Sequence, residues 1–482
     1  MPTFSVQSRL VFAAIVAFIV FFGVTNWFRH VNLLTAQFDM GNMDQVLWHS
    51  LHGNWFRMAS PVYGGEVHLR TAVHADFLLL GYLPFYALWP DPRVPIVLQV
   101  VFVASGAIPL YWLARSRLGD WRGAGVAIAY LLYPTLQWAL IFDVHAVILA
   151  MPLLLWAWWA MKQKRWWLYG VTAALAILGK EEVGLVVAAM GLYWVWRRGY
   201  RVAALASLVV GLGWSILMVG WAIPQARQAP GHFALGYFSD FGDSYTAILK
   251  HMITQPLRVL GDVVDGGTFS LLRALFSPLA LLPLLGWPVL LVAGPEFAIN
   301  LLSSNPNQQT IFFQYMAAIV PFIFIATVDG WSTLRAWLAT HHGRWTQVQL
   351  RRALDIGLIG CFLAGVWIWS PLPGTRHHGD AIRVFIPSPY RQDVALVQRQ
   401  LLPADRVATT NNLAPQFSRR ELIWSFPNNL EQADAVVILA GGPYDVITTA
   451  QLLDEIKTLA ADPRWKVIHH HDAFWYFRRV AA

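Results

Sequence analysis

Two acidic residues, Asp39 and Asp44, stand five positions apart in the segment FDMGNMDQVLW. A carboxylate can take a proton from a reacting hydroxyl group, or it can cap a helix. A helix over this segment would present Asp44, Gln45 and Trp48 on one face, and Gln45 and Trp48 are candidates for substrate binding. Asp39 would then lie at or before the N-cap, near Gly41. We therefore keep two interpretations of Asp39, a capping residue and a catalytic residue.

A second motif, FDVHAV, places Asp143 and His145 in an almost loopless turn between two apolar runs. Imidazole and carboxylate groups both bind metal ions. However, residues two positions apart do not share one face of a helix, so the spacing alone does not build a chelate. The pair is interpreted either as a site for a divalent cation, Mg²⁺ or Mn²⁺, or as a hydrogen-bonded structural pair.

A third motif, GKEEVG, brings three charges between apolar runs, at Lys180, Glu181 and Glu182. Lysine acts as a point charge, so it can pair with a neighbouring glutamate or bind a phosphate group beside an adjacent acid. Both interpretations stay open. Further polar candidates for substrate binding lie within or beside apolar runs: Arg70, His74, Glu296, Gln314 and Tyr315.

The signatures of several soluble enzyme classes are missing from the sequence, which has no Walker loop, no nucleophile elbow and no HExxH motif. The single cysteine, Cys361, excludes a disulfide framework within one chain. The triplet of His469, His470 and His471 falls between strand-like segments. We interpret it as a solvated turn at the end of a hairpin.

The composition is that of a membrane protein. Of the 482 residues, 57% are hydrophobic and 13% are charged, whereas about 25% are charged in soluble domains. The mean hydropathy is +0.47. The net charge of +8 comes from short basic clusters between apolar runs, which are typical of topology signals rather than of nucleic-acid binding. We therefore expect an α-helical polytopic membrane protein that binds no nucleic acid.

Spans of about 17 to 25 apolar residues cross a bilayer, and helices packed inside a bundle are sometimes shorter. An apolar stretch at residues 74–89 is interpreted as a re-entrant or interfacial helix, because counting it as a span would move the basic loops to the other side. Eleven spans are predicted, at residues 8–28, 94–114, 123–142, 145–161, 166–180, 183–196, 202–222, 269–285, 287–302, 311–330 and 353–370.

The basic loops fix the predicted orientation, because short cytoplasmic loops accumulate Lys and Arg. With the N-terminus in the cytoplasm, the clusters that begin at Arg115, Lys162, Arg197 and Arg335 all fall inside. The opposite face then receives a first outer loop at 29–93, a second at 223–268 and everything beyond Ser370. On this topology the candidate chemical residues converge on the extracytoplasmic face of the cell (inner) membrane.

The chain beyond residue 370 changes character, and helix-like and strand-like runs alternate. A small α/β domain is therefore expected at 371–482, outside the membrane, after a transmembrane domain at 1–370. The expected helices are 394–401 and 448–460, and the expected strands are 406–410, 422–426, 435–439 and a hairpin at 465–478.

These motifs together resemble the DUF2079 family of predicted prokaryotic membrane proteins. The resemblance rests on the ordered set FDMGNMDQ, HADF, LLYP, FDVH, KEE, QYMAAIVPF, SRRELIWSFP and FWYFRR, and it runs over roughly residues 10–480. That family looks like part of the GT-C group of integral membrane glycosyltransferases, which take sugars from polyprenyl-phosphate carriers. The resemblance implies a GT-C-like fold and a polyprenyl-phosphate sugar donor. It also implies a loop-one catalytic acid at Asp39, with Asp44 as the second candidate.

The resemblance further implies a set of roles. Asp39 would be the base, and Lys180, with Arg70 or His74, would contact the donor phosphate. Asp143 and His145 would hold the first loop or bind a divalent cation. Two other classes of function are weighed against this one: a transporter or flippase of a lipid-linked or polar solute, and an inactive scaffold of envelope polysaccharide assembly.

Overall fold

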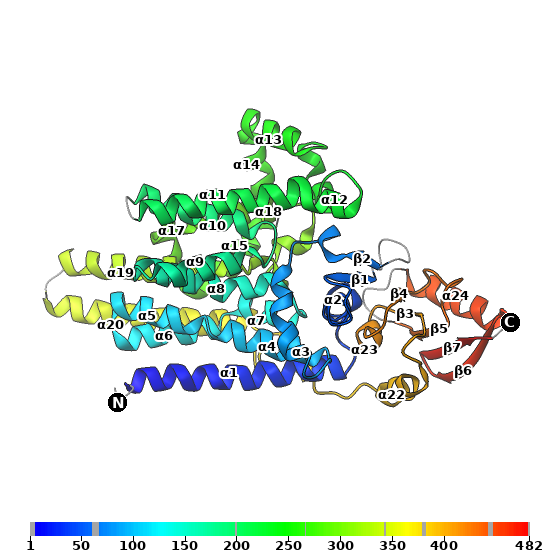
Figure 1. The fold of residues 1–482 in the computed structure, drawn as a ribbon. Coiled ribbons are helices and arrows are strands. Elements are labelled where there is room, and N and C mark those ends of the chain that lie inside the picture. Colours follow the sequence, from blue (N-terminus) through cyan, green and yellow to red (C-terminus); the bar gives the residue numbers. More distant parts are fainter. Residues whose placement is uncertain are drawn as a thin grey trace.

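The computed structural model describes residues 5–59, 67–197, 200–265, 267–341, 344–377, 382–441 and 447–480. Most of these residues form helices that run along one long axis, and a small sheet lies at one end of this bundle (Figure 1). The N-terminus lies at the opposite end (Figure 1). We call the end of the bundle beside the sheet the sheet end.

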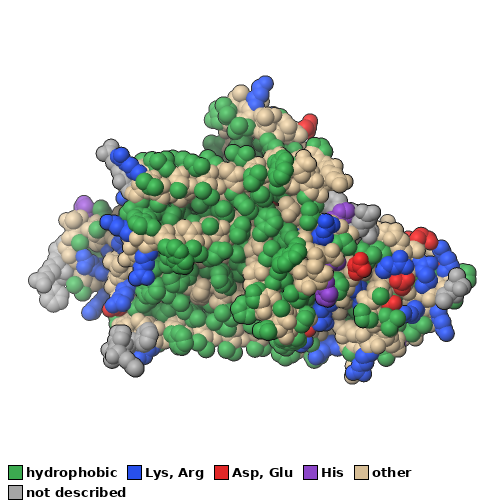
Figure 2. All heavy atoms as spheres, viewed as in Figure 1, with side chains coloured by type: hydrophobic (Ala, Val, Ile, Leu, Met, Phe, Trp, Pro, Cys, Tyr) green, Lys and Arg blue, Asp and Glu red, His purple; other side chains and the backbone are tan. Residues whose placement is uncertain are grey.

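Five helical segments in the described part of the chain are long and apolar enough to cross a membrane. Figure 2 shows a broad hydrophobic band over the middle of the bundle, with Lys and Arg side chains gathered at the end that holds the N-terminus. The prediction of a polytopic helical membrane protein is confirmed. The five segments are Val6–Val31, Arg93–Leu118, Asp120–Ile141, Arg201–Arg227 and Thr346–Trp369.

The remaining helices are shorter or broken. The main helices of the bundle are α1 (Val6–Val31), α4 (Arg93–Ala104), α5 (Ala107–Leu118), α6 (Asp120–Leu131), α7 (Pro134–Ile141), α8 (Ala146–Lys162), α9 (Trp166–Ile177), α10 (Val183–Trp196), α11 (Arg201–Leu217), α15 (Thr268–Phe276), α16 (Leu282–Leu285), α17 (Trp287–Leu290), α18 (Gly294–Leu302), α19 (Val320–His341) and α20 (Arg344–Trp369). Two helices of the second loop, α13 (Tyr245–Thr254) and α14 (Pro256–Asp265), project sideways from the bundle (Figure 1).

The predicted span 269–285 is not one helix. Helix α15 ends at Phe276, and α16 begins only at Leu282. Between them the backbone φ angles of Ala280 and Leu281 are +49° and +58°, which is the left-handed region that ends a helix. A proline near each end of the break, Pro278 and Pro283, has no N–H to continue the helical hydrogen bonds.

The predicted span 311–330 is displaced along the chain. Only a short 3-10 turn, η9 (Gln314–Met316), precedes helix α19, which begins at Val320 and continues to His341. The helix starts there because Pro321 fits the first turn, where its missing N–H costs nothing. The predicted interfacial helix at 74–89 is reduced to η3 (Phe77–Tyr82) and α3 (Leu83–Tyr86), too short to span a bilayer.

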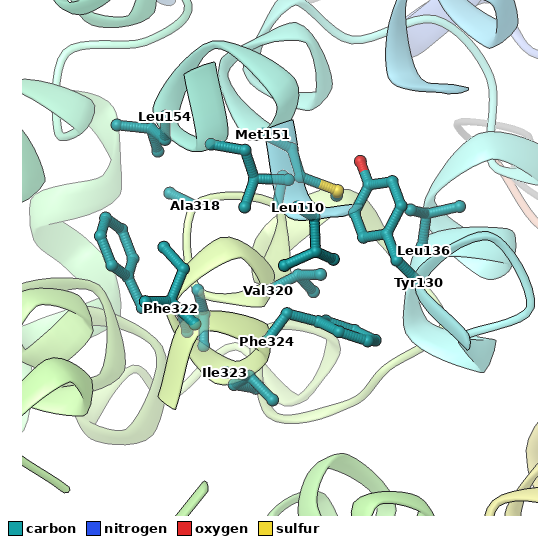
Figure 3. Packing of buried hydrophobic residues seen from close by; sticks show 14 of the residues in the cluster. Leu110, Tyr130, Leu136, Met151, Leu154, Ala318, Val320, Phe322, Ile323 and Phe324 are labelled. Atoms are coloured by element: carbon teal, nitrogen blue, oxygen red, sulfur yellow. The ribbon is translucent and has the colours of Figure 1, made fainter. Parts of the chain in front are cut away.

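The centre of the bundle is built around α8, which is apolar and buried almost all round, as expected of a core helix. Figure 3 shows Met151 of α8 among side chains of α5, α6 and α19. Phe324 packs edge-on against Tyr130 and Tyr133, with ring centroids 5.6 Å and 5.1 Å apart. Such aromatic pairs each contribute about 0.5–1.5 kcal/mol beyond their buried area.

Helices α10 and α11 approach each other closely because glycines line their contact. A methyl group added at Gly191 would meet the carbonyl oxygen of Ala204, and one added at Gly184 would meet Gly211 and Ser215. Small residues at such positions let two helix backbones pack closely inside a membrane. This contact fixes the turn before α10, which carries Lys180.

The C-terminal sheet has five strands in the order β4–β3–β5–β7–β6. Strand β3 pairs in parallel with β4 and β5, while β7 pairs in antiparallel with β5 and β6. Every predicted element of this region is present within a few residues. Its elements are α22 (Arg391–Gln400), β3 (Val407–Thr409), α23 (Ala414–Phe417), β4 (Ile423–Ser425), β5 (Ala435–Leu439), α24 (Thr449–Ala461), β6 (Trp465–His471) and β7 (Phe474–Arg479).

The histidine triplet is not a solvated turn, so that prediction is wrong. All three histidines lie in strand β6. His469 and His471 point to one side, where each bonds one oxygen of Asp393, at 2.6 Å and 2.9 Å. His470 stacks on Trp475 on the other side. Successive side chains of a strand point to opposite faces of the sheet, so the middle histidine of the triplet faces away from the other two.

The sheet region and the first outer loop share a hydrophobic core. Leu33, near the start of the loop, and Ala59, near its middle, are buried among residues of α22 and the sheet, such as Val397 and Val437. A backbone hydrogen bond also joins the loop to the C-terminal region, because the Gln37 N–H donates to the Asn411 carbonyl at 2.9 Å. The loop is therefore held by the C-terminal region as well as by the bundle.

Candidate active site

Asp39 lies in η1 (Gln37–Gly41), a π-helical turn that leads into α2 (Asn42–Leu51). The N-cap of α2 is Gly41, and no side chain caps it, so the capping interpretation of Asp39 is wrong. The imidazole Nε2 of His145 donates to Asp39 Oδ1 at 2.9 Å. The Asp39 side chain remains 22% exposed. This carboxylate is thus held in place and still accessible to a ligand.

Asp143 anchors the start of the same loop. Its Oδ2 accepts the Ala36 N–H at 3.0 Å, and its Oδ1 lies 3.3 Å from the Arg29 guanidinium. Burial and the nearby Asp39 charge raise the pKa of Asp143 to about 6, against the opposing charge of Arg29. Gln99 accepts the His145 N–H at 2.9 Å and fixes the turn. The turn therefore orients both Asp39 and the chain that carries it.

The predicted cation site at Asp143 and His145 does not gather three ligands. Asp39, Asp143 and His145 are not among the described residues that bring three donor atoms within 4.8 Å of one another. Asp143 is instead paired with Arg29, and His145 is hydrogen-bonded to Asp39. The two side chains of FDVHAV therefore bond different partners rather than each other.

Asp44 lies in a different environment from Asp39. Its side chain is fully buried, and its two oxygens accept hydrogen bonds from the hydroxyls of Tyr86 and Ser418, both at 2.6 Å. Burial raises its pKa to about 6, although both hydrogen bonds favour the charged form. With both oxygens engaged and no exposure, Asp44 joins α2 to the C-terminal region.

Gln45 and Trp48 also turn away from Asp39. The Gln45 amide donates to the Arg420 carbonyl at 3.0 Å and accepts the Ala59 N–H at 2.6 Å. The Trp48 ring stacks on His52, with centroids 4.1 Å apart. Both residues thus have partners other than Asp39.

Lys180 occupies the tight turn between α9 and α10. Its Nζ lies 2.5 Å from Glu182 Oε1 and 5.9 Å from the centre of the Tyr315 ring. Burial alone would lower the pKa of Lys180, but the adjacent Glu182 and Glu181 carboxylates raise it above its usual value. The two carboxylates therefore favour the charged form of Lys180 at the edge of a mostly apolar bundle.

Two buried side-chain oxygens on the polar residues of this region lack hydrogen-bond partners among the described residues, Glu296 Oε2 and Gln314 Oε1. Glu296 lies on α18 within electrostatic range of Lys180 and Glu182. A buried polar atom without a partner costs about 1–3 kcal/mol. Such atoms are natural acceptors for the hydroxyl groups of a ligand.

An aromatic row connects Asp39 to Lys180. Phe142 stacks on the imidazole that bonds Asp39, and it meets Phe313 edge-on at 4.6 Å. Phe313 in turn contacts Tyr315 at 6.2 Å between centroids. Tyr315 lies beneath Lys180 and within electrostatic range of Asp39. A row of ring contacts thus links the accessible carboxylate to the buried cation.

The remaining predicted residues, Arg70 and His74, each have a carboxylate partner. Arg70 is buried and forms a bidentate pair with Asp76, at 2.7 Å in its shortest contact, so its guanidinium is already neutralised. His74 bonds Glu181 Oε1 at 2.8 Å. The same oxygen contacts His232 Nε2 at 3.0 Å. Sequence reasoning missed His232, because it stands alone in the second outer loop with no motif around it.

A comparison of the sequence with known protein families identifies one family that matches most of the chain. The family described as "Predicted membrane protein (DUF2079)" matches residues 29–473. The chain belongs to the DUF2079 family. No curated protein matches this DUF2079 chain in sequence.

Comparison with solved structures shows the fold. ArnT from Cupriavidus metallidurans bound to undecaprenyl phosphate aligns with a TM-score of 0.52 at 11% identity, over 97% of this chain and 98% of ArnT. The apo state of ArnT aligns with a TM-score of 0.53 at 12% identity, over 96% and 98%. AglB from Archaeoglobus fulgidus, in complex with an inhibitory peptide and a dolichol-phosphate, aligns with a TM-score of 0.43 at 12% identity, over 88% of this chain and 69% of AglB. The DUF2079 chain has a GT-C-like fold.

Proposed function

We propose that this DUF2079 protein is a membrane glycosyltransferase that moves a sugar from a polyprenyl-phosphate donor to an acceptor hydroxyl on the extracytoplasmic face of the cell membrane. The observation that carries the proposal is the pairing of an accessible carboxylate, Asp39, with a buried cation, Lys180, across one aromatic row. The fold shared with ArnT, a protein solved with undecaprenyl phosphate bound, supports a lipid-linked phosphate as the ligand.

Asp39 is the proposed base. In an inverting transfer its carboxylate takes the proton of the acceptor hydroxyl, and the oxygen then attacks the anomeric carbon of the sugar. The bond from that carbon to the phosphate oxygen breaks, and polyprenyl phosphate leaves with the bonding electrons. The hydrogen bond from His145 holds the carboxylate in one orientation, as a base must be held to reach its proton.

Lys180 is the proposed contact of the leaving phosphate. An ammonium group beside the phosphate stabilises the negative charge that develops as the glycosidic bond breaks. In the ligand-free arrangement Lys180 is balanced by Glu182, so a bound phosphate replaces or shares that partner. The unpartnered acceptors of Glu296 and Gln314 would then receive hydrogen bonds from sugar hydroxyls.

The deciding experiment measures sugar transfer by purified protein in native-lipid nanodiscs. A panel of radiolabelled polyprenyl-phosphate sugars is supplied, and product and free sugar are counted for wild type and for Asp39→Asn. Asp240→Asn, a substitution of an exposed carboxylate in the second loop, is the matched control. Donor-dependent turnover in wild type and in the control, with loss in Asp39→Asn, is expected.

A different result would reject the proposal. If no donor is bound or turned over while a known transferase works in the same preparation, the protein is not an enzyme of this class. Binding without any turnover, unchanged by Asp39→Asn, would favour transport of the lipid-linked sugar.

A further inference from the structure

Three donor atoms converge at one point beside the proposed site. His74 Nδ1 and His232 Nε2 lie 2.8 Å and 3.0 Å from the same oxygen, Glu181 Oε1. All three atoms lie within 4.8 Å of one another, and no other group of three His, Cys or acidic residues does so in the described part of the chain. Glu181 and His232 are buried, and His74 is half-buried. The other oxygen of Glu181 accepts the Ala75 N–H at 2.9 Å.

We propose that His74, Glu181 and His232 bind a zinc ion. Two imidazoles and one carboxylate are a donor set that zinc takes in proteins, with a fourth position left for water or a ligand. Tetrahedral zinc with bonds of about 2.0 Å places its donors about 3.3 Å apart, so the observed separations need only small outward shifts. The set also meets the chemical preference of zinc, because nitrogen ligands dominate it.

Binding requires a specific change at His232. Its Nδ1 accepts the Ala234 N–H at 3.0 Å, so Nε2 carries the proton in the metal-free arrangement. For Nε2 to bind zinc, the proton must move to Nδ1, and the Ala234 N–H must give up this acceptor. The coordination bond to zinc would replace this one backbone hydrogen bond as the main interaction of the imidazole.

The ion would fasten three distant segments together. His74 comes from the first outer loop, Glu181 from the turn between α9 and α10, and His232 from the start of the second outer loop, just before η5 (Phe233–Phe241). Glu181 is the immediate neighbour of Lys180 in the chain. Zinc at this point would therefore fix both outer loops against the turn that carries the cation. The zinc site does not depend on the proposed function.

A second cluster of two histidines and one carboxylate provides the matched control. His469 and His471 bond different oxygens of Asp393, so their donor atoms do not converge on one point. His471 is also about half exposed. A substitution there changes the number of histidines without touching the proposed zinc ligands.

The test measures the metal content of the full-length protein, purified through a tag without histidine. The protein is dialysed against Zn²⁺, then against metal-free buffer, and zinc is counted by plasma mass spectrometry. Wild type and His471→Ala should hold about one zinc per chain, whereas His232→Ala and His74→Ala should lose most of it. Size-exclusion chromatography establishes that each variant is folded.

A spectroscopic measurement on the wild type does not depend on any variant folding. Cobalt(II) exchanged into the site should show the strong visible absorption of a four-coordinate ion, and X-ray absorption of the zinc form should show two imidazole ligands. Wild type without bound zinc, equal zinc in His232→Ala, or loss only in His471→Ala would each overturn the proposal. The last result would place the ion on strand β6.

Discussion

Asp39 and Asp44 belong to the same short segment of the first outer loop, yet they face opposite parts of the molecule. Asp39 faces the bundle, keeps one hydrogen bond and stays 22% exposed. Asp44 faces the C-terminal region, is fully buried and accepts two hydroxyl hydrogen bonds. The chemical use of a carboxylate is therefore set by what covers it rather than by its position in a motif.

The comparison also gives the C-terminal region a physical role. Ser418 binds Asp44, the Arg420 carbonyl binds Gln45, and Ser425 donates to Gln37 at 2.8 Å. These bonds stand on both sides of Asp39 along the chain. The C-terminal region holds the loop on one side while His145 holds the carboxylate on the other, and this arrangement keeps the loop in one conformation.

The largest expected effect is a difference in sugar-transfer rate between variants of Asp39 and of Asp44. Asp39→Asn should lower the sugar-transfer rate by about 10²–10⁴-fold, the usual contribution of a general base, while its Oδ1 still accepts from His145 and the unfolding temperature stays near that of wild type. Asp44→Asn should retain transfer per folded molecule. Both are measured in the nanodisc assay with thermal unfolding alongside. Equal losses in the two variants would remove the distinction.

The next effect tests the other end of the aromatic row. Lys180→Ala should weaken binding of the polyprenyl-phosphate donor by about 10- to 100-fold, because a hydrogen bond to a charged group contributes about 1.5–3 kcal/mol. Donor affinity is measured by titrating the donor into proteins that also carry Asp39→Asn, because this second substitution prevents turnover. Lys250→Ala, on an exposed face of α13, should bind as wild type does. Unchanged affinity in Lys180→Ala would refute the phosphate contact.

A third effect is confined to stability. Ser418→Ala leaves one oxygen of buried Asp44 without its donor, and an unsatisfied buried group costs about 1–3 kcal/mol. The unfolding temperature should therefore fall, whereas the transfer rate of the folded protein should not change. Ser239→Ala in the second loop, where the side chain is exposed, should leave both unchanged. A selective loss of activity in Ser418→Ala would mean that Asp44 takes part in the chemistry.

The smallest effect is a pH dependence. Burial raises the pKa of Asp44 from its ordinary 3.8 to about 6, so the folded protein binds this proton more tightly than the unfolded chain. The resulting stability is fully present below pH 3.8 and is lost as the pH rises through about 6. The unfolding temperature of wild type relative to Asp44→Asn should therefore decrease between these values. Asp240→Asn serves as the control, and a difference that grows with pH would contradict the buried environment.

Local patterns predicted the C-terminal region well. Helix α24 follows Thr448, whose hydroxyl accepts the Gln451 N–H. The Gln451 side chain in turn accepts the Thr448 N–H, so four residues of sequence mark the start of the helix. Strand β5 was delimited by a run of buried apolar residues, Ala435–Leu439. Both signals act over a few residues, and no distant partner is needed to find them.

The bundle and the site depended more on distant contacts. The span at 269–285 was wrong because its prolines break a run that hydropathy reads as continuous. Gln45 and Arg70 were expected at the substrate, but their partners, the Arg420 carbonyl and Asp76, commit them elsewhere. The family resemblance implied a loop-one acid at Asp39 or Asp44, and only the fold shows how differently the two carboxylates are covered.

The bonds between the first outer loop and residues 411–425 have a consequence for biosynthesis. The ribosome makes the loop long before it makes these supports. A nascent chain already threaded into the membrane would carry Asp39 on an unsupported loop. The loop is therefore supported only after residues 411–425 have been made, and chains truncated before them would hold the carboxylate without the geometry to use it.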